Sequence, residues 1–230
     1  MTHPKSPALG LSRILLCGIV AVSALLTGCA APKKTDYSAF RQAKPASILV
    51  LPPLNESPDV KATFSMLSHA TYPLAEAGYY VMPVTLVAET FQQNGLQNAA
   101  EMHEVSSGKL KEIFGADAAL YVKVTRYGST YTVLSSAAIV SAEARLVDLS
   151  TNTLLWSGKA TASNDEGNNN SGGGLIGMLV TAAVKQILNN VTDASHNVAG
   201  ITSARLLSAG QPHGILYGPR SPMYGKDGLN

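Results

Sequence analysis

Residues 47–53 read Ser-Ile-Leu-Val-Leu-Pro-Pro, a short run of branched apolar side chains that two prolines stop. Such a run is typical of a strand buried on both faces of a sheet. Asn55, Ser57 and Pro58 then supply helix-start signals. The residues that follow place apolar side chains at three- and four-residue steps: Phe64, Leu67, Ala70, Leu74 and Ala77. A buried strand followed by an amphipathic helix predicts an α/β fold, with a kink in the helix at Pro73.

The chain continues to alternate between strand and helix patterns. Residues 79–83 predict a second short strand, and residues 84–93 predict a helix that Asn94-Gly95 ends. Residues 109–114 predict a further helix, which Ser107 can cap and Gly115 terminates. The first half of the chain therefore has the order β-α-β-α-α.

Strict alternation of side chains follows in the second half. Side chains alternate between two faces in three segments: residues 118–125, 140–147 and 154–160. We expect turns at Gly128 and at residues 148–152. The last two segments should pair as an antiparallel hairpin. We expect a single α/β domain of two or three layers with a mixed sheet, in the order β-α-β-α-α-β-β-β, ending in an antiparallel hairpin plus C-terminal helices.

The amino terminus predicts a secretion signal. Lys5 and Arg13 give it a positive start, and residues 14–26 form an apolar run without an acidic residue. That run is shorter than the ~20 residues that a transmembrane helix needs. Its length and flanks are typical of a signal peptide, so we expect residues 1–28 to be removed.

The end of this run resembles the lipobox of bacterial lipoproteins. Leu26, Thr27 and Gly28 precede Cys29. The resemblance implies that the Cys29 thiol receives diacylglycerol, that the bond before it is cleaved, and that the new amino group is acylated. Each buried lipid methylene contributes ~0.8 kcal/mol, so three chains would anchor the protein durably. Because Cys17 lies in the signal, no thiol remains for a disulfide, for catalysis or for a metal.

The remaining chain divides into three parts. Residues 29–46 predict a lipid-anchored tether, residues 47–207 the α/β domain, and residues 208–230 an extended tail rich in proline and glycine. Removing residues 1–28 leaves 202 residues with 15 basic and 15 acidic side chains. This neutral balance gives no reason to expect nucleic acid as a partner.

One segment of the domain is unusually apolar. Residues 175–191 predict a helix that is apolar on nearly every side until Lys185. We expect Leu175, Ile176, Leu179 and Val180 to contact another subunit or the membrane. The alternative is a helix enclosed by the sheet and the carboxyl-terminal region.

The motifs associated with enzymes are weak in this sequence. The dinucleotide-binding pattern G-x-G-x-x-G is matched by Gly172, Gly174 and Gly177, and Asp193 lies at the offset of a ribose-binding acid. However, no strand leads directly into these glycines, as that binding motif requires. The Ser106–Lys109 spacing fits S-x-x-K, without the accompanying motifs of serine acyl enzymes. Helix capping explains it better.

Ligand clusters are also missing from the sequence pattern. The histidines are scattered, with no pair at zinc-ligand spacing. Asp117 and Glu143 could meet in space, but surface roles are the simpler interpretation. We therefore expect no catalytic residues, no metal and no cofactor.

Several short motifs carry a family resemblance. In chain order they are Ile48-Leu-Val-Leu-Pro-Pro, Gly78-Tyr-Tyr-Val, Gly115-Ala-Asp, Trp156-Ser-Gly and Tyr217-Gly-Pro-Arg. The chain resembles a family of Gram-negative outer-membrane lipoproteins that carries only a domain-of-unknown-function label. Its fold is similar to the periplasmic part of the curli-secretion lipoprotein and to the amino-terminal domain of TolB. These relatives imply an α/β domain that works in envelope transport or assembly.

The resemblance also implies a location and a role. Ala30 follows the lipidated cysteine where, in Gram-negative lipoproteins, an aspartate favours the inner membrane. We expect an outer-membrane lipoprotein facing the periplasm, a non-enzymatic accessory subunit of an export or surface-assembly complex. Its partners would be the membrane, through the lipid, and other envelope lipoproteins or further copies of this chain. The alternative is a lipid-anchored periplasmic enzyme or small-ligand-binding module, with a pocket near residues 52–57 and 115–117.

Overall fold

The computed structural model describes residues 35–131, 136–166 and 193–227 of the chain. The chain divides into two units, residues 1–35 and residues 36–230, and the fold below is that of the second unit. The signal peptide, the lipobox, Ala30 and the apolar segment 175–191 lie outside the described residues. None of the helices in the described ranges is long and apolar enough to cross a membrane.

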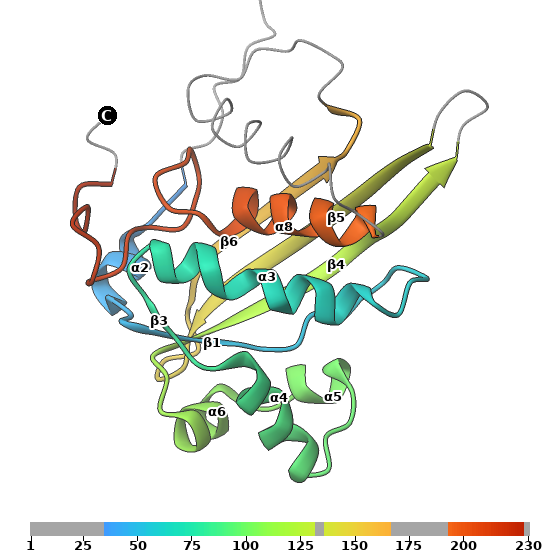
Figure 1. Cartoon of the computed structure of the whole chain (residues 1–230). Helices are drawn as coiled ribbons and strands as arrows, with labels where there is room; N and C mark the ends of the chain where they lie inside the picture. Colours follow the sequence, from blue (N-terminus) through green and yellow to red (C-terminus); the bar gives the residue numbers. More distant parts are fainter. Residues whose placement is uncertain (1–34, 132–135, 167–192, 228–230) are drawn as a thin grey trace, which may run out of the picture. The chain divides into compact units, whose positions relative to one another are not determined.

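The second unit is an α/β domain built on a mixed six-stranded sheet (Figure 1). The strand order is β3-β1-β4-β5-β6, and β2 pairs with β4 beyond the end of β1. β1 runs parallel to β3 and β4, whereas β4, β5 and β6 are antiparallel to one another. The strands are β1 Ser47–Val50, β2 Leu54–Asn55, β3 Tyr80–Val81, β4 Ala118–Tyr131, β5 Ser136–Asp148 and β6 Leu154–Ser163.

Helices cover both faces of this sheet, which makes three layers (Figure 1). On one face, α2, α3 and α8 pack over a large core that includes Ile48, Leu120 and Trp156. On the other, α4, α5 and α6 pack over a smaller core around Leu49, Leu51 and Leu110. The helices are α2 Ser38–Ala43, α3 Ala62–Glu76, α4 Val84–Gln93, α5 Ala99–His103, α6 Ser107–Phe114 and α8 Ala194–Leu207.

The predicted fold class is confirmed, and several element boundaries need correction. The strand at 47–50, the helix at 84–93 and the antiparallel pairing of β5 with β6 agree with the sequence pattern. Gly128 is not a turn, because β4 continues through it to Tyr131. α3 begins at Ala62 instead of Pro58, and it passes through Pro73 to end three residues later. α5 was not predicted.

β4 shows how the alternating pattern positions the core. Ala118, Leu120, Val122 and Val124 point into the larger core. The pairing with β5 shifts between Val124 and Arg126, which is the signature of a β-bulge. The bulge adds one residue, so Tyr127 instead of Arg126 is buried next.

The predicted tether is too long. Residues 38–43 form α2, and Phe40 is only 3% exposed within the larger core. The Tyr37 hydroxyl donates a 2.6 Å hydrogen bond to the Gly214 carbonyl oxygen. The domain therefore begins near Asp36, and the stretch from there to residue 46 is part of it.

The carboxyl-terminal segment is packed against the domain, in contrast to the extended tail that we expected. Ile215 and Leu216 are buried, and the Trp156 indole donates a hydrogen bond to the His213 carbonyl at 2.9 Å. The Gly218 amide donates to the Ala77 carbonyl at 2.7 Å, next to the left-handed Gly78. The motifs at residues 78–81 and 217–220 thus meet in space, although 139 positions separate Gly78 from Tyr217.

Candidate functional site

Most of the residues that matched enzyme motifs in the sequence have structural roles in the described part of the chain. Ser106, not Ser107, caps α6, since its hydroxyl accepts the Lys109 amide at 3.4 Å. The Lys109 ammonium pairs with Glu112 at 3.0 Å, so both ends of this spacing have a structural role. Asp193 caps α8 by accepting the His196 amide, and its carboxylate also pairs with Lys61. Gly172, Gly174 and Gly177 lie outside the described residues.

Asp117 and Glu143 do not meet. The Asp117 carboxylate accepts the backbone amides of Ala46 and Ser47 and the Ser47 hydroxyl at 2.9–3.1 Å. Burial raises the pKa of this carboxyl, but the hydrogen bonds from Ser47 and Ala46 and the Lys111 ammonium outweigh it and hold the pKa below its usual range. Glu143 lies in the sheet beside Lys123. Asp117 therefore holds the start of β1 against β4.

The predicted pocket between residues 52–57 and 115–117 does not exist as a single site. β1 and β4 are parallel, with Ile48 opposite Ala118. Residues 115–117 precede β4 and lie at the amino end of the pair, whereas Pro52 follows β1 at its carboxyl end. The two segments are thus at opposite ends of the strands.

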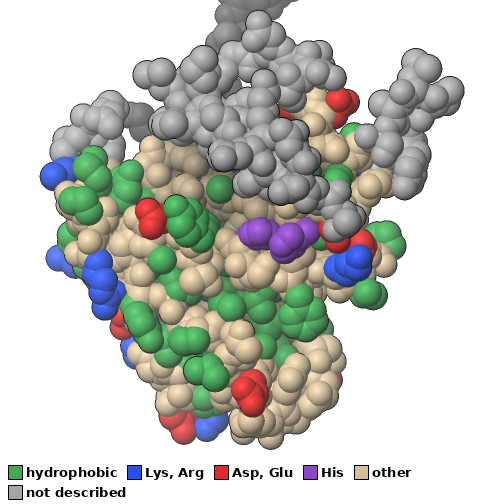
Figure 2. Space-filling model, viewed as in Figure 1, with side chains coloured by type: hydrophobic (Ala, Val, Ile, Leu, Met, Phe, Trp, Pro, Cys, Tyr) green, Lys and Arg blue, Asp and Glu red, His purple; other side chains and the backbone are tan. Residues whose placement is uncertain are grey.

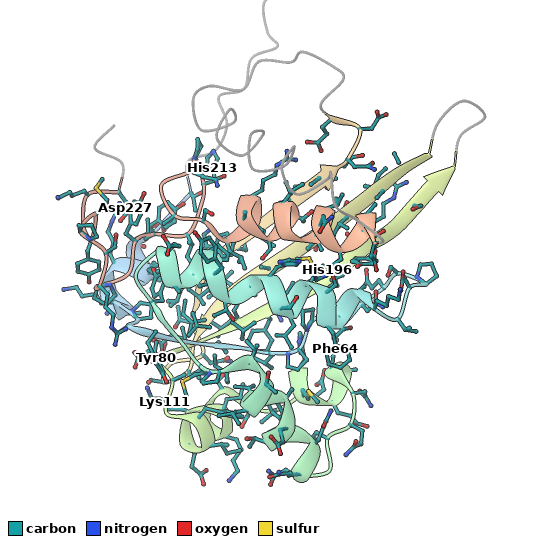
Figure 3. All side chains as sticks on the ribbon, viewed as in Figure 1. Phe64, Tyr80, Lys111, His196, His213 and Asp227 are labelled. Atoms are coloured by element: carbon teal, nitrogen blue, oxygen red, sulfur yellow. The ribbon has the colours of Figure 1, made fainter. Side chains whose placement is uncertain are left out.

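Two histidines that are far apart in sequence, His69 of α3 and His196 of α8, meet between these helices, and Figure 3 labels His196. The His69 and His196 ring centres are 4.4 Å apart, and His69 Nε2 lies 3.1 Å from the His196 carbonyl oxygen. Ser65 Oγ lies 2.9 Å from His196 Nδ1. Among the described residues, no three His, Cys, Asp or Glu side chains are grouped to hold a metal ion.

An apolar surface on α3 is the first feature that sequence reasoning misassigned. Phe64 was expected in the core, yet it is 63% exposed, and Tyr72 two helical turns later is 72% exposed. Val60, just before the helix, is 84% exposed. We call Val60, Phe64 and Tyr72 the α3 stripe. Figure 2 shows hydrophobic side chains on this face of the molecule, and Phe64 projects from the side of α3 away from α8 (Figure 3).

A pocket on the other face of the sheet is the second feature that the sequence did not indicate. It has a volume of about 390 Å³ and lies where the α5–α6 layer ends over β4 and β5. Its lining includes His103, Ser107, Tyr121, Arg145, Val147 and Asn152. These residues come from two helices, two strands and a turn, so no sequence spacing relates them. Only the cross-strand pairing of Tyr121 with Arg145 could have been anticipated, from the register of the alternating strands.

The side chains of this pocket are held by one another. The His103 ring packs edge-on against Tyr121, with centres 5.2 Å apart, and His103 Nε2 donates to the Pro52 carbonyl at 2.9 Å. The Arg145 guanidinium lies 5.3 Å from the Tyr121 ring centre. The Ser107 hydroxyl donates to Asn152 Oδ1 at 2.6 Å.

Comparison with known proteins places the chain in a family. A family model described as "Putative lipoprotein GNA1162-like" matches residues 35–220. The chain belongs to the GNA1162-like lipoprotein family. It is 52% identical over 208 residues to "Putative lipoprotein NMB1124/NMB1162" of Neisseria meningitidis serogroup B, covering 90% of this chain and 95% of that protein. Membership in a lipoprotein family agrees with the expectation that the chain carries a lipid anchor.

A solved structure of a GNA1162 protein agrees with this fold. The crystal structure of lipoprotein GNA1162 from Neisseria meningitidis is 57% identical and superposes with a TM-score of 0.52, covering 64% of this chain and 100% of that chain. A PelC dodecamer from Paraburkholderia phytofirmans is 15% identical with a TM-score of 0.41, covering 77% of this chain and 91% of that chain. A similarity of that size supports no argument about assembly or function.

Proposed function

We propose that this GNA1162-like lipoprotein is held by lipid on Cys29 at the periplasmic face of the outer membrane. There it would serve as a non-enzymatic accessory subunit of an envelope export or surface-assembly complex. Family membership supports the lipid anchor, and Ala30, in place of an aspartate, supports the outer membrane. Fractionation of membranes tests the location, and recovery of the protein in the inner membrane would contradict it.

The observation that supports a subunit role is the α3 stripe. Phe64 and Tyr72 are eight residues apart, about 80° around the helix, so both face its exposed side, and Val60 lies just before the first turn. Large aromatic side chains exposed together are characteristic of protein–protein interfaces, where they provide most of the binding free energy. The α3 stripe suits a protein partner that presents an apolar surface.

Site-specific photo-crosslinking in membranes tests this role. A photoreactive phenylalanine analogue at position 64 should form an adduct with a partner protein. Phe64→Asp combined with Tyr72→Asp should abolish the co-purification of that partner. Both side chains are exposed, so the charges should leave the thermal stability of the domain nearly unchanged.

A matched control lies on the other layer of the domain. Ile113 on α6 is 44% exposed, so a crosslinker or an aspartate there should have no effect on the partner. Equal adducts from positions 64 and 113 would mean non-specific proximity. An unchanged complex in the Phe64→Asp, Tyr72→Asp variant would reject the α3 stripe as the interface.

A further inference from the structure

The pocket at the rim of the α5–α6 layer combines one free cation with uncharged donors. Arg145 projects from β5, and the section of the chain that the structure describes places no Asp or Glu within ion-pair distance of it. No acidic residue lines the pocket. By contrast, Lys111 pairs with Asp117, and Lys123 pairs with Glu56 and Glu143. The Arg145 charge is therefore available to a ligand.

Tyr121 and His103 fix the orientation of this cation. The guanidinium packs against the Tyr121 ring, and a stacked guanidinium still presents the N–H groups of its edge. The His103 ring packs edge-on against the same tyrosine ring and is itself held by the Pro52 carbonyl. The geometry of Arg145 is thus prepared before any ligand arrives, which lowers the entropic cost of binding.

Asn152 contributes a neutral donor to the same pocket. It occupies the turn between β5 and β6 in a left-handed conformation, with φ of 57°. Its Oδ1 accepts the Ser107 hydroxyl, which leaves the Nδ2 hydrogens facing away from that bond. No described residue accepts them. A guanidinium edge and an amide donor are the groups that bind a carboxylate.

We propose that this pocket binds a small molecule through a carboxylate group, which Arg145 holds at its guanidinium edge and Asn152 at its amide. The apolar part of the ligand would lie against Val147 and the Tyr121 ring. The volume of about 390 Å³ is sufficient for a small organic acid.

The charge of the lining favours a carboxylate over a phosphate ester. Burial lowers the pKa of His103, so its ring is neutral at neutral pH and Arg145 is the one charged side chain in the lining. A phosphate ester carries nearly two negative charges at that pH, whereas a carboxylate carries one. One cation neutralises the carboxylate completely.

Three matched probes test the inference on the full mature lipoprotein in detergent micelles. Benzoate carries the carboxylate, benzamide is its uncharged isostere, and phenyl phosphate carries the alternative anion. The readout is the NMR signal of the His103 ring, with the His69 ring between α3 and α8 as an internal reference. Benzoate should shift the His103 signal saturably and leave His69 unchanged, and benzamide should bind at least about tenfold more weakly.

Substitutions at position 145 test whether Arg145 binds the carboxylate. Arg145→Gln should weaken benzoate binding at least about tenfold, and Arg145→Lys, which keeps the charge without the planar fork, should lie between it and the parent. Lys159→Gln is the matched control, because Lys159 is an exposed cation on β6 that does not line the pocket. Circular dichroism of each variant establishes that it is folded.

Four results would each overturn the proposal. They are equal binding of benzoate and benzamide, unchanged binding by a folded Arg145→Gln variant, tighter binding of phenyl phosphate than of benzoate, and no saturable shift with any probe up to about 10 mM. None of them bears on the α3 stripe, because that surface lies on the other face of the sheet.

Discussion

His69 of α3 lies against His196 of α8, with their ring centres 4.4 Å apart and the His69 ring bonded to the His196 backbone carbonyl. Burial, and then the proximity of His196, lower the pKa of His69, and the carbonyl bond opposes them only in part. A positive charge on the half-buried His69 ring would be unfavourable. The pair therefore makes the α3–α8 contact sensitive to acid.

The stability of the domain should fall as the pH drops below the ordinary histidine value of about 6.5. The unfolded chain then binds a proton that folded His69 resists, so the contribution of the neutral ring is present above that pH and lost below it. His69→Gln should reduce the loss of unfolding free energy between about pH 7.5 and about pH 5, as measured by urea denaturation. Burial also lowers the pKa of His103. His103→Gln should therefore remove a separate part of the same loss of unfolding free energy. A pH dependence identical in both variants and the parent would exclude these rings as its source.

Asp117 should be a stability residue. Asp117→Ala removes one carboxylate acceptor from two backbone amides and a hydroxyl at the start of β1. We expect a loss of about 2 kcal/mol, less than the full value for a buried charge because the carboxylate is partly exposed. Chemical denaturation measures it, and Glu143→Ala on the same sheet should cost less. A larger loss for Glu143→Ala would contradict the assigned role.

The Trp156-Ser-Gly motif has a steric cause that substitution can test. A Cβ atom at Gly158 would lie 2.3 Å from Trp156 Cζ2, because both residues point to the same side of β6. Gly158→Ala should therefore destabilise the domain by about 1–3 kcal/mol through displacement of the indole. Gly108→Ala is the control, since a Cβ there meets no atom within 4 Å. Near-ultraviolet circular dichroism would report the displaced indole, and an unchanged spectrum with unchanged stability would argue against this packing.

Cys29→Ala should block lipid attachment. Metabolic labelling with palmitate should give a labelled parent and an unlabelled variant, which accumulates as uncleaved precursor or as a soluble species. Incorporation of as much label into the variant as into the parent would refute the lipobox interpretation.

Leu179→Asp tests the apolar segment 175–191. If Leu175, Ile176, Leu179 and Val180 contact another subunit, the variant should reduce the size of the cross-linked complex and retain its thermal stability. The alternative, a helix enclosed within the domain, predicts an unchanged assembly with strongly reduced stability. That second result would remove the segment from the list of interfaces.

Local patterns in the sequence were sufficient for the fold class and insufficient for the surfaces. The alternation in β4 and the glycine that ends α6 are properties of neighbouring residues, so they could be predicted, whereas the predicted cap at the start of α6 was one residue late. Phe64 was misassigned because successive three-residue steps drift around a helix of 3.6 residues per turn, and Phe64 lies about 120° from Ala70. The pocket was missed because it joins His103, Tyr121, Arg145 and Asn152 through the sheet register and a turn, which no spacing encodes.

The bond from the Tyr37 hydroxyl to the Gly214 carbonyl connects positions that are 177 residues apart. Arg220 Nη1 also donates to the Ala46 carbonyl, so the last part of the described chain closes over the first. Contacts of such high contact order form late and slow the search for the native state, because a long loop must close before they contribute. A chain still emerging from the ribosome lacks these closing contacts. The amino-terminal end of the domain is therefore fastened only after residues 214–220 have been synthesised.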